Sequence, residues 1–155
     1  MLSQLAAFLA SAKRSGNAAR GDPATASPAL AGSRQQEYRT GRFVYRDIHF
    51  GLARFAGQET VTFDDRVIWS MVYAGGVLPG VADEAEIAVT YNCLRQALHM
   101  VEIERPFRGP RALGIGALRY VDESDGDVAS FRGTERILRD GATVYRLDYN
   151  GGLIR

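Results

Sequence analysis

The sequence predicts an α+β domain in which two pseudo-symmetric helix-plus-antiparallel-meander repeats form a sheet or partly open barrel packed with two helices. Three observations predict it. Apolar residues recur at helical spacing in two segments, they alternate with a period of two after each segment, and residues 55–78 resemble residues 131–154. A chain of 155 residues fits a single domain covering residues 1–155, since this length is typical of one hydrophobic core.

The sequence of the first half predicts one helix, one long loop and three or four strands. Apolar residues recur every three or four positions in residues 3–14, which predicts the helix. Residues 15–36 are rich in Ala, Ser, Gly and Pro and predict a flexible loop, either a lid over a site or a disordered connector. Strands are expected at about residues 38–50, 55–63 and 67–73.

The second half repeats this order. Asp83 and the acidic residues after it predict a capped helix over residues 83–101. Residues 104–116 contain two prolines and three glycines, so we expect a loop there. The remaining strands are expected at about residues 117–121, 128–138 and 143–149.

Turn residues separate the predicted strands. Asp64-Asp65 and Asp140-Gly141 each lie between two strands and predict tight hairpins, because Asp and Gly tolerate positive φ. Gly75-Gly76 and Gly151-Gly152 follow the last strand of each half. We expect these glycine pairs to end the strands, as glycine permits positive φ or a close backbone approach.

An internal repeat relates the two halves at an offset of 76 residues without a gap. Seven of its positions are identical, whereas unrelated segments of this length would share about one or two at ordinary residue frequencies. We therefore expect a duplicated unit. The identical pairs are Phe55/Phe131, Gly57/Gly133, Glu59/Glu135, Asp64/Asp140, Tyr73/Tyr149, Gly75/Gly151 and Gly76/Gly152.

The repeat places one glutamate, Glu59 or Glu135, on an otherwise apolar strand face of each half. A buried carboxylate is costly unless it is paired or neutralised. Two interpretations follow: a pair of acids beside a cavity between the halves, or two structural ion pairs with nearby arginines. A glycine bulge that turns each glutamate outward is a variant of the second interpretation.

Aromatic residues and one arginine-rich segment complete the candidate ligand-binding site. Tyr73 and Tyr149 precede the glycine pairs, and Trp69 lies on the same strand face as Tyr73. They could line a pocket or belong to the core. Arg108 lies in the densest basic segment, where a guanidinium could bind an anion or simply remain solvated.

Composition excludes several classes of protein and site. The 19 basic and 18 acidic residues balance, so we expect no nucleic-acid partner and no membrane partner. Cys93 is the single cysteine and cannot form an internal disulfide, which with the absence of a secretory signal pattern predicts a cytoplasmic protein. The two histidines and Cys93 lack metal-ligand spacing, and no phosphate-binding loop motif is present, so we expect no metal and no cofactor.

Short segments spread over nearly the whole chain carry a resemblance to a known family. They include Tyr45-Arg46-Asp47, Phe55-Ala56-Gly57-Gln58-Glu59, Trp69-Ser70-Met71, Phe107-Arg108-Gly109-Pro110, Phe131-Arg132-Gly133 and Gly151-Gly152-Leu153. With these segments the chain resembles a bacterial family of uncharacterised domains, found alone or behind a helix-turn-helix of the XRE repressor type. The resemblance implies a sensor or ligand-binding role and supplies no catalytic residues.

These observations leave three functions open. The first is a binding or sensor domain for a small polar ligand, contacted by Glu59, Glu135, Trp69, Tyr73, Tyr149 and Arg108. The second is a small hydrolase or isomerase that uses the two glutamates as acid and base. The third is a protein-interaction module, such as a homodimer formed through a sheet edge or the N-terminal helix. We expect a binding domain rather than an enzyme.

Overall fold

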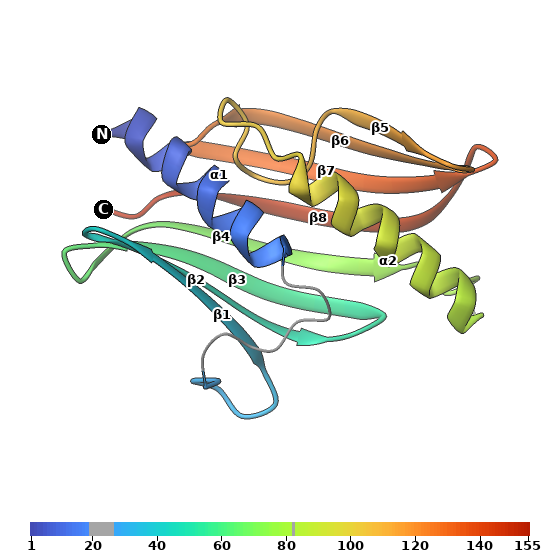
Figure 1. Cartoon of the computed structure of the whole chain (residues 1–155), viewed down its shortest axis with the longest axis horizontal. Coiled ribbons are helices and arrows are strands. Elements are labelled where there is room, and N and C mark those ends of the chain that lie inside the picture. Colours follow the sequence, from blue (N-terminus) through green and yellow to red (C-terminus); the bar gives the residue numbers. More distant parts are fainter. Residues whose placement is uncertain (19–26, 82) are drawn as a thin grey trace.

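The computed structural model describes residues 1–18, 27–81 and 83–155 and shows one eight-stranded antiparallel sheet with two helices (Figure 1). The helices are α1 (Leu2–Ala18) and α2 (Glu84–His99). Four strands follow α1, namely β1 (Arg34–Thr40), β2 (Phe43–Gly51), β3 (Arg54–Phe63) and β4 (Arg66–Val77). Four more follow α2, namely β5 (Ala112–Ile115), β6 (Leu118–Asp127), β7 (Ser130–Arg139) and β8 (Ala142–Leu153).

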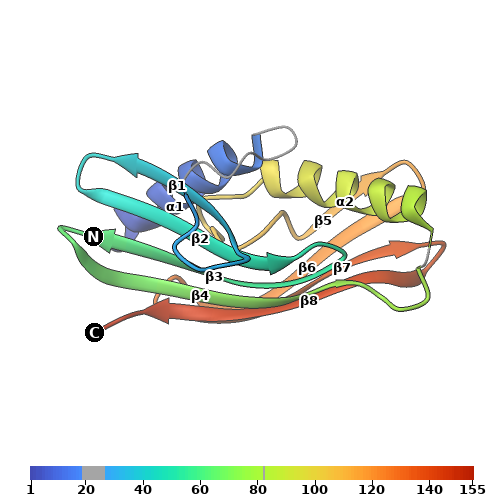
Figure 2. The same ribbon diagram turned by 90° about the horizontal axis from the view of Figure 1, so that it is seen from below.

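The strand order is β1-β2-β3-β4-β8-β7-β6-β5, so each meander forms one half of the sheet. The two meanders meet where β4 pairs with β8, and Tyr73 lies opposite Tyr149 in that pair. The sheet curves around the helices without closing, because β1 and β5 remain separate edges (Figure 2). The predicted α+β class is confirmed, and the sheet is open rather than a barrel.

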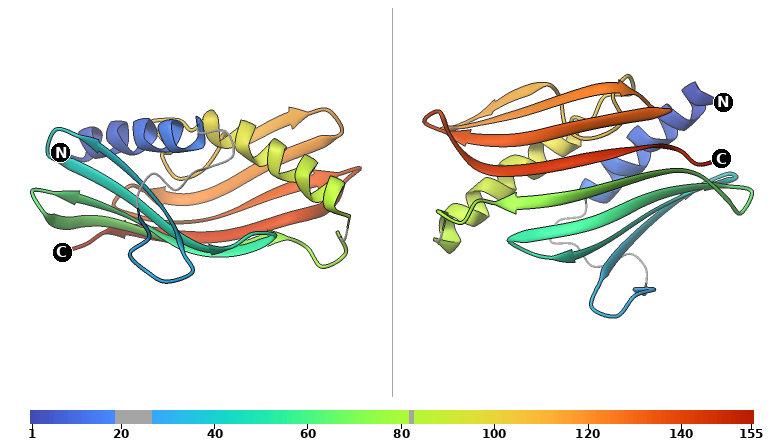
Figure 3. Two further views of the ribbon diagram at one scale, coloured as in Figure 1. Left: turned by 60° about the horizontal axis from the view of Figure 1, so that its bottom comes forward. Right: turned by 180° about the vertical axis from the view of Figure 1, so that it is seen from behind.

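Both helices lie on the concave face of the sheet, where they bury the core (Figure 3). Leu5 and Leu9 of α1 are fully buried, and so are Trp69 and Tyr145 of the central strands. Inward and outward residues alternate along the strands, as the period-two pattern predicts. Neither described helix has the length and apolar character needed to cross a membrane.

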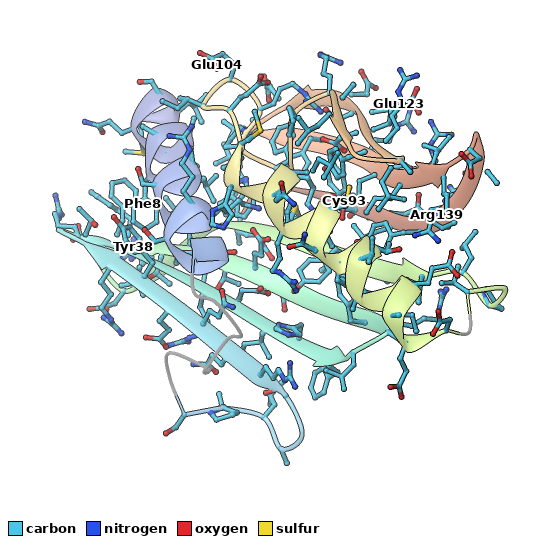
Figure 4. All side chains as sticks on the ribbon, turned by 45° about the vertical axis from the view of Figure 1, so that its right-hand side comes forward. Phe8, Tyr38, Cys93, Glu104, Glu123 and Arg139 are labelled. Atoms are coloured by element: carbon cyan, nitrogen blue, oxygen red, sulfur yellow. The ribbon has the colours of Figure 1, made fainter. Side chains whose placement is uncertain are left out.

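Helix α1 packs on the β1–β2 hairpin through aromatic rings. Phe8 and Tyr38, labelled in Figure 4, have ring centroids 5.8 Å apart, and Phe8 stacks on Phe43 at 4.9 Å. Such pairs contribute beyond their buried area. They hold α1 over the first half of the sheet.

Both predicted hairpins are confirmed. Asp64 and Asp65 have φ of 50° and 61°, and Asp140 and Gly141 have φ of 49° and 82°. Two consecutive residues with positive φ are the requirement of a type I′ turn, whose twist matches that of the strands it joins.

The glycine pairs do not end the strands, so this prediction is wrong. β4 continues through Gly75 to Val77, and β8 continues through Gly151 to Leu153. A Cβ on Gly75 would lie 2.3 Å from the carbonyl oxygen of Arg146, and a Cβ on Gly151 would lie 2.3 Å from that of Ser70. The glycines therefore allow β4 and β8 to approach each other at the centre of the sheet.

The predicted loop of residues 15–36 is shorter than expected. α1 continues through Gly16 to Ala18, because burial of its inner face outweighs the cost of a helical glycine, which is about 1 kcal/mol. At the other end, β1 begins at Arg34 and pairs with β2. The prediction of a lid or connector falls mainly on residues 19–26, which lie outside the described residues. The second predicted loop, residues 104–116, contains the short edge strand β5.

Candidate functional site

The two glutamates of the predicted site are buried, and each is paired with a cation. Glu59 is 3% exposed, and its Oε2 lies 2.6 Å from the Nζ of Lys13 on α1. Glu135 is fully buried and accepts two hydrogen bonds from Arg108, of 3.1 and 2.6 Å. The ion-pair interpretation therefore describes both carboxylates, although the cation in the first half is a lysine.

Glu135 is the centre of a fully connected polar network. The hydroxyls of Tyr120 and Tyr145 each donate to one of its carboxylate oxygens at 2.7 Å. With the two bonds from Arg108, every oxygen of this carboxylate has two donors. Such a network rigidifies a core, but it leaves Glu135 without a free position for a ligand.

Lys13, the only lysine of the chain, is held between the first half and the loop after α2. Its Nζ donates to the carbonyl oxygen of Phe107 at 2.6 Å as well as pairing with Glu59. Burial lowers the pKa of Lys13, and the charge of Glu59 opposes this shift. Sequence reasoning did not assign Lys13 to the site, because it does not belong to the apolar stripe that predicted the helix. The signal that could have identified it is that it is the only lysine in the sequence.

Asp47 is the second residue that sequence reasoning missed. It lies opposite Glu59 in the β2–β3 pair, and it accepts a hydrogen bond of 2.6 Å from the Tyr73 hydroxyl. Burial and then the charge of Glu59 raise the pKa of Asp47 to about 7. The alternation of side chains along β2 could have identified it, because residues two positions apart share a face and Asp47 therefore lies on the same face as the buried Tyr45.

A pocket of about 350 Å³ opens between α2 and β1–β4, beside the end of α1; we call it the helix-side pocket. The side chain of Asp47 is 16% exposed and therefore reachable from solvent. A second cavity of about 40 Å³ adjoins Asp47, Glu59 and Lys13. The polar lining of the helix-side pocket includes Arg34, Asp47, His49, Tyr73, Arg95 and Arg108.

The structure brings together only part of the predicted site. Tyr73 and Arg108 line the helix-side pocket, and the Arg108 guanidinium carbon lies 5.6 Å from the centre of the Tyr73 ring. Glu59 lines the small cavity instead. Trp69 is fully buried and donates to the carbonyl oxygen of Val128 at 3.0 Å. Glu135 and Tyr149 belong to the second half of the sheet.

Gly57 leaves space for the Tyr73 ring because it has no side chain. The two residues pair across β3 and β4, and a Cβ on Gly57 would lie 2.4 Å from the Tyr73 hydroxyl oxygen. We predict that Gly57→Ala lowers the free energy of unfolding by about 1–3 kcal/mol, because the ring must move off its partner Asp47. Gly114→Ala is the control, since Gly114 also lies in a strand and a Cβ there meets nothing within 4 Å. Equal unfolding midpoints in urea for both variants would contradict this account.

Together, the fold and the pocket define a small α+β domain with a polar pocket between its helices and the first half of its sheet. A family profile for a domain of unknown function (DUF5680) matches residues 47–154, more than half of the chain, so the chain belongs to this family. Searches of curated proteins and of solved structures give no match. Within the described residues, no group of three or more His, Cys, Asp and Glu side chains is placed to hold a metal ion.

Proposed function

We propose that this DUF5680 domain binds a small polar organic molecule with an anionic group in the helix-side pocket. The observation that carries the proposal is that a partly buried acid, Asp47, and two exposed arginines line one cavity. Small-molecule sites are concave and mostly apolar, with a few polar groups that orient the ligand.

The arginines at the pocket support an anionic group. Arg34 on β1 and Arg95 on α2 are exposed and line the pocket, and neither forms an ion pair within the part of the chain that the structure describes. A guanidinium fork matches a carboxylate or phosphate geometrically. The apolar remainder of the lining, including Phe55, Leu94 and Leu98, would contact the body of the ligand.

The enzyme alternative that uses Glu59 and Glu135 receives no support from this geometry. General acid and base groups need access to a substrate. Glu59 is held by Lys13, and Glu135 is held by Arg108 and two tyrosines. We therefore propose roles for these glutamates in positioning Lys13 and Arg108 rather than in proton transfer.

We also propose that the two halves are copies of one unit and that the domain acts as a cytoplasmic sensor. Matching backbone hydrogen bonds support the duplication: Val77 donates to Ala53 and Leu153 donates to Ala129, each at 3.0 Å. The resemblance to domains that occur behind a helix-turn-helix supports the sensor role. In such a role a partner protein would respond to the ligand-bound pocket.

Replacing Arg95 tests the proposed function. We expect succinate, L-arginine or another member of a panel of small carboxylates to raise the melting temperature. Arg95→Glu should weaken the affinity for that compound about tenfold or more, since it reverses a charge that faces the anion. Isothermal titration calorimetry measures the affinity.

The control for this experiment is Arg66→Glu. Arg66 is also exposed, but it lies at the β3–β4 hairpin and does not line the pocket. Both variants should fold like the unmodified protein, because substitutions of exposed residues change stability little. If both variants weakened the affinity equally, or if neither did, the anion would bind elsewhere.

A further inference from the structure

The second half of the sheet contains a guanidinium bound to an aspartate. The Nη2 of Arg105, in the segment after α2, lies 2.7 Å from the Oδ2 of Asp122 and 2.8 Å from the Oγ of Ser124. Asp122 also accepts a hydrogen bond of 2.8 Å from the Tyr149 hydroxyl. Its side chain is completely buried, so Arg105 fills this place within the protein.

Strand register gives Asp47 of the first half the same position. In both halves the aspartate lies opposite the repeated glutamate, and the tyrosine that bonds it lies opposite the repeated glycine. His49 and Ser124 also correspond, since each lies opposite that glycine. Each pair of the first half has a counterpart in the second: Asp47–Glu59 matches Asp122–Glu135, Gly57–Tyr73 matches Gly133–Tyr149, and His49–Gly57 matches Ser124–Gly133.

The charges of the two halves differ by one cation. In the second half, Asp122 has Arg105 and Glu135 has Arg108, so each buried carboxylate has a guanidinium. In the first half, Lys13 pairs with Glu59 at 2.6 Å. Among the described residues, the group within ion-pair distance of Asp47 is His49, at 3.8 Å, and it is a cation only when protonated.

We propose that Asp47 binds the guanidinium group of a ligand in the helix-side pocket, as Asp122 binds Arg105 in the second half. The inference rests on the proposed function and names its ligand class: a molecule with a guanidinium at one end and a carboxylate at the other. The guanidinium contacts Asp47 beside the Tyr73 hydroxyl that donates to it, and the carboxylate contacts Arg34 or Arg95, which are exposed and line the same pocket. Guanidinium and carboxylate groups form paired, charge-assisted hydrogen bonds, which favour this class over a simple ammonium.

Binding of this ligand depends on the protonation of Asp47. The charged groups that act on it are Lys13 from α1, Glu59 from β3 and Arg108 from the segment after α2, with His49 beside it on β2. A cation prefers the ionised carboxylate, and the pKa of Asp47 is about 7. Affinity should therefore rise with pH through this range, and the ligand should lower the pKa of Asp47.

The experiment is isothermal titration calorimetry of the full chain with L-arginine, methylguanidine and succinate. We expect both guanidinium compounds to bind more tightly at about pH 8 than at about pH 6, since Asp47 ionises between these values. Asp47→Asn should weaken L-arginine about tenfold or more and remove the pH dependence. This variant should fold, because a neutral amide resembles the protonated carboxyl that burial favours.

Two further measurements separate the outcomes. Asp65→Asn is the matched control, since Asp65 is exposed at a hairpin turn, and it should leave the affinity for L-arginine unchanged. Tyr73→Phe removes the hydroxyl that holds Asp47 and should weaken L-arginine by a smaller factor than Asp47→Asn. Binding of succinate that depends on Arg95, without binding of either guanidinium compound, would overturn the inference and leave the proposed function intact. Absence of binding by all three compounds would count against both.

Discussion

Replacing Arg108 with methionine is expected to lower the free energy of unfolding by about 3–5 kcal/mol, because it leaves a buried charge without its partner. Arg108 donates two hydrogen bonds to Glu135, which is fully buried and has no access to water. The hydroxyls of Tyr120 and Tyr145 remain as donors, but they supply no positive charge. Unfolding in urea, followed through the fluorescence of Trp69, measures the loss.

Two further variants decide whether the unpaired charge is the cause. The double variant Arg108→Met with Glu135→Gln should recover most of the loss, since a neutral amide needs no counter-ion. Arg146→Met removes an arginine from an exposed pair with Asp148 and should leave the urea midpoint unchanged. A double variant as unstable as the single one would show that Arg108 acts through packing alone.

Phe107→Ala is expected to cost about 3–5 kcal/mol, the usual range for removing a buried phenylalanine. The Phe107 ring is 1% exposed and stacks on Phe131, with centroids 4.0 Å apart and planes inclined by 10°. Phe131 in turn stacks on Trp69 at 5.7 Å. The substitution would leave a cavity at one end of this ring stack, which joins the segment after α2 to the centre of the sheet.

Substitutions at Phe107 change its packing without removing the hydrogen bond that its backbone accepts from Lys13. Lys13 donates to the backbone carbonyl of Phe107, so alanine retains that acceptor. Phe107→Leu keeps more apolar volume and should lose less stability than Phe107→Ala. Phe50→Ala is the control, since Phe50 is 43% exposed and should change the melting temperature little. Similar losses for Phe50→Ala and Phe107→Ala, measured by thermal unfolding, would contradict this account.

Much of the fold was readable from the sequence because its signals are local. Apolar spacing indicated the helices, and the positive-φ turns at Asp64-Asp65 and Asp140-Gly141 marked two hairpins. The prediction that Gly75 ends a strand was wrong because the role of this glycine is not local. It lies inside β4, where β8 passes so close that a Cβ would clash, and the sequence around Gly75 does not indicate that contact.

The residues of the candidate site show the same division between local and tertiary signals. Two residues named from the sequence, Tyr73 and Arg108, line the helix-side pocket, whereas Asp47 and Lys13 were not foreseen. Asp47 becomes significant only because Glu59 and Tyr73 approach it from the two strands that follow. Burial and these neighbours set its pKa, and both depend on strands brought together by pairing.

By itself, the sequence determined the class of fold, the alternation of a helix and a group of strands in each half, two turns and the presence of a carboxylate on an apolar face in each half. It did not separate β1 from β2, which it predicted as one strand at residues 38–50. Periodicity and turn chemistry are properties of neighbouring residues, so they can be read along the chain. Only the tertiary structure decided which cation each carboxylate meets. Lys13 lies on α1 and Arg108 lies in the segment after α2. Both α1 and α2 cover the same face of the sheet (Figure 2). In the second half Arg105 pairs with the buried Asp122, whereas Asp47 of the first half is partly exposed and lines a pocket.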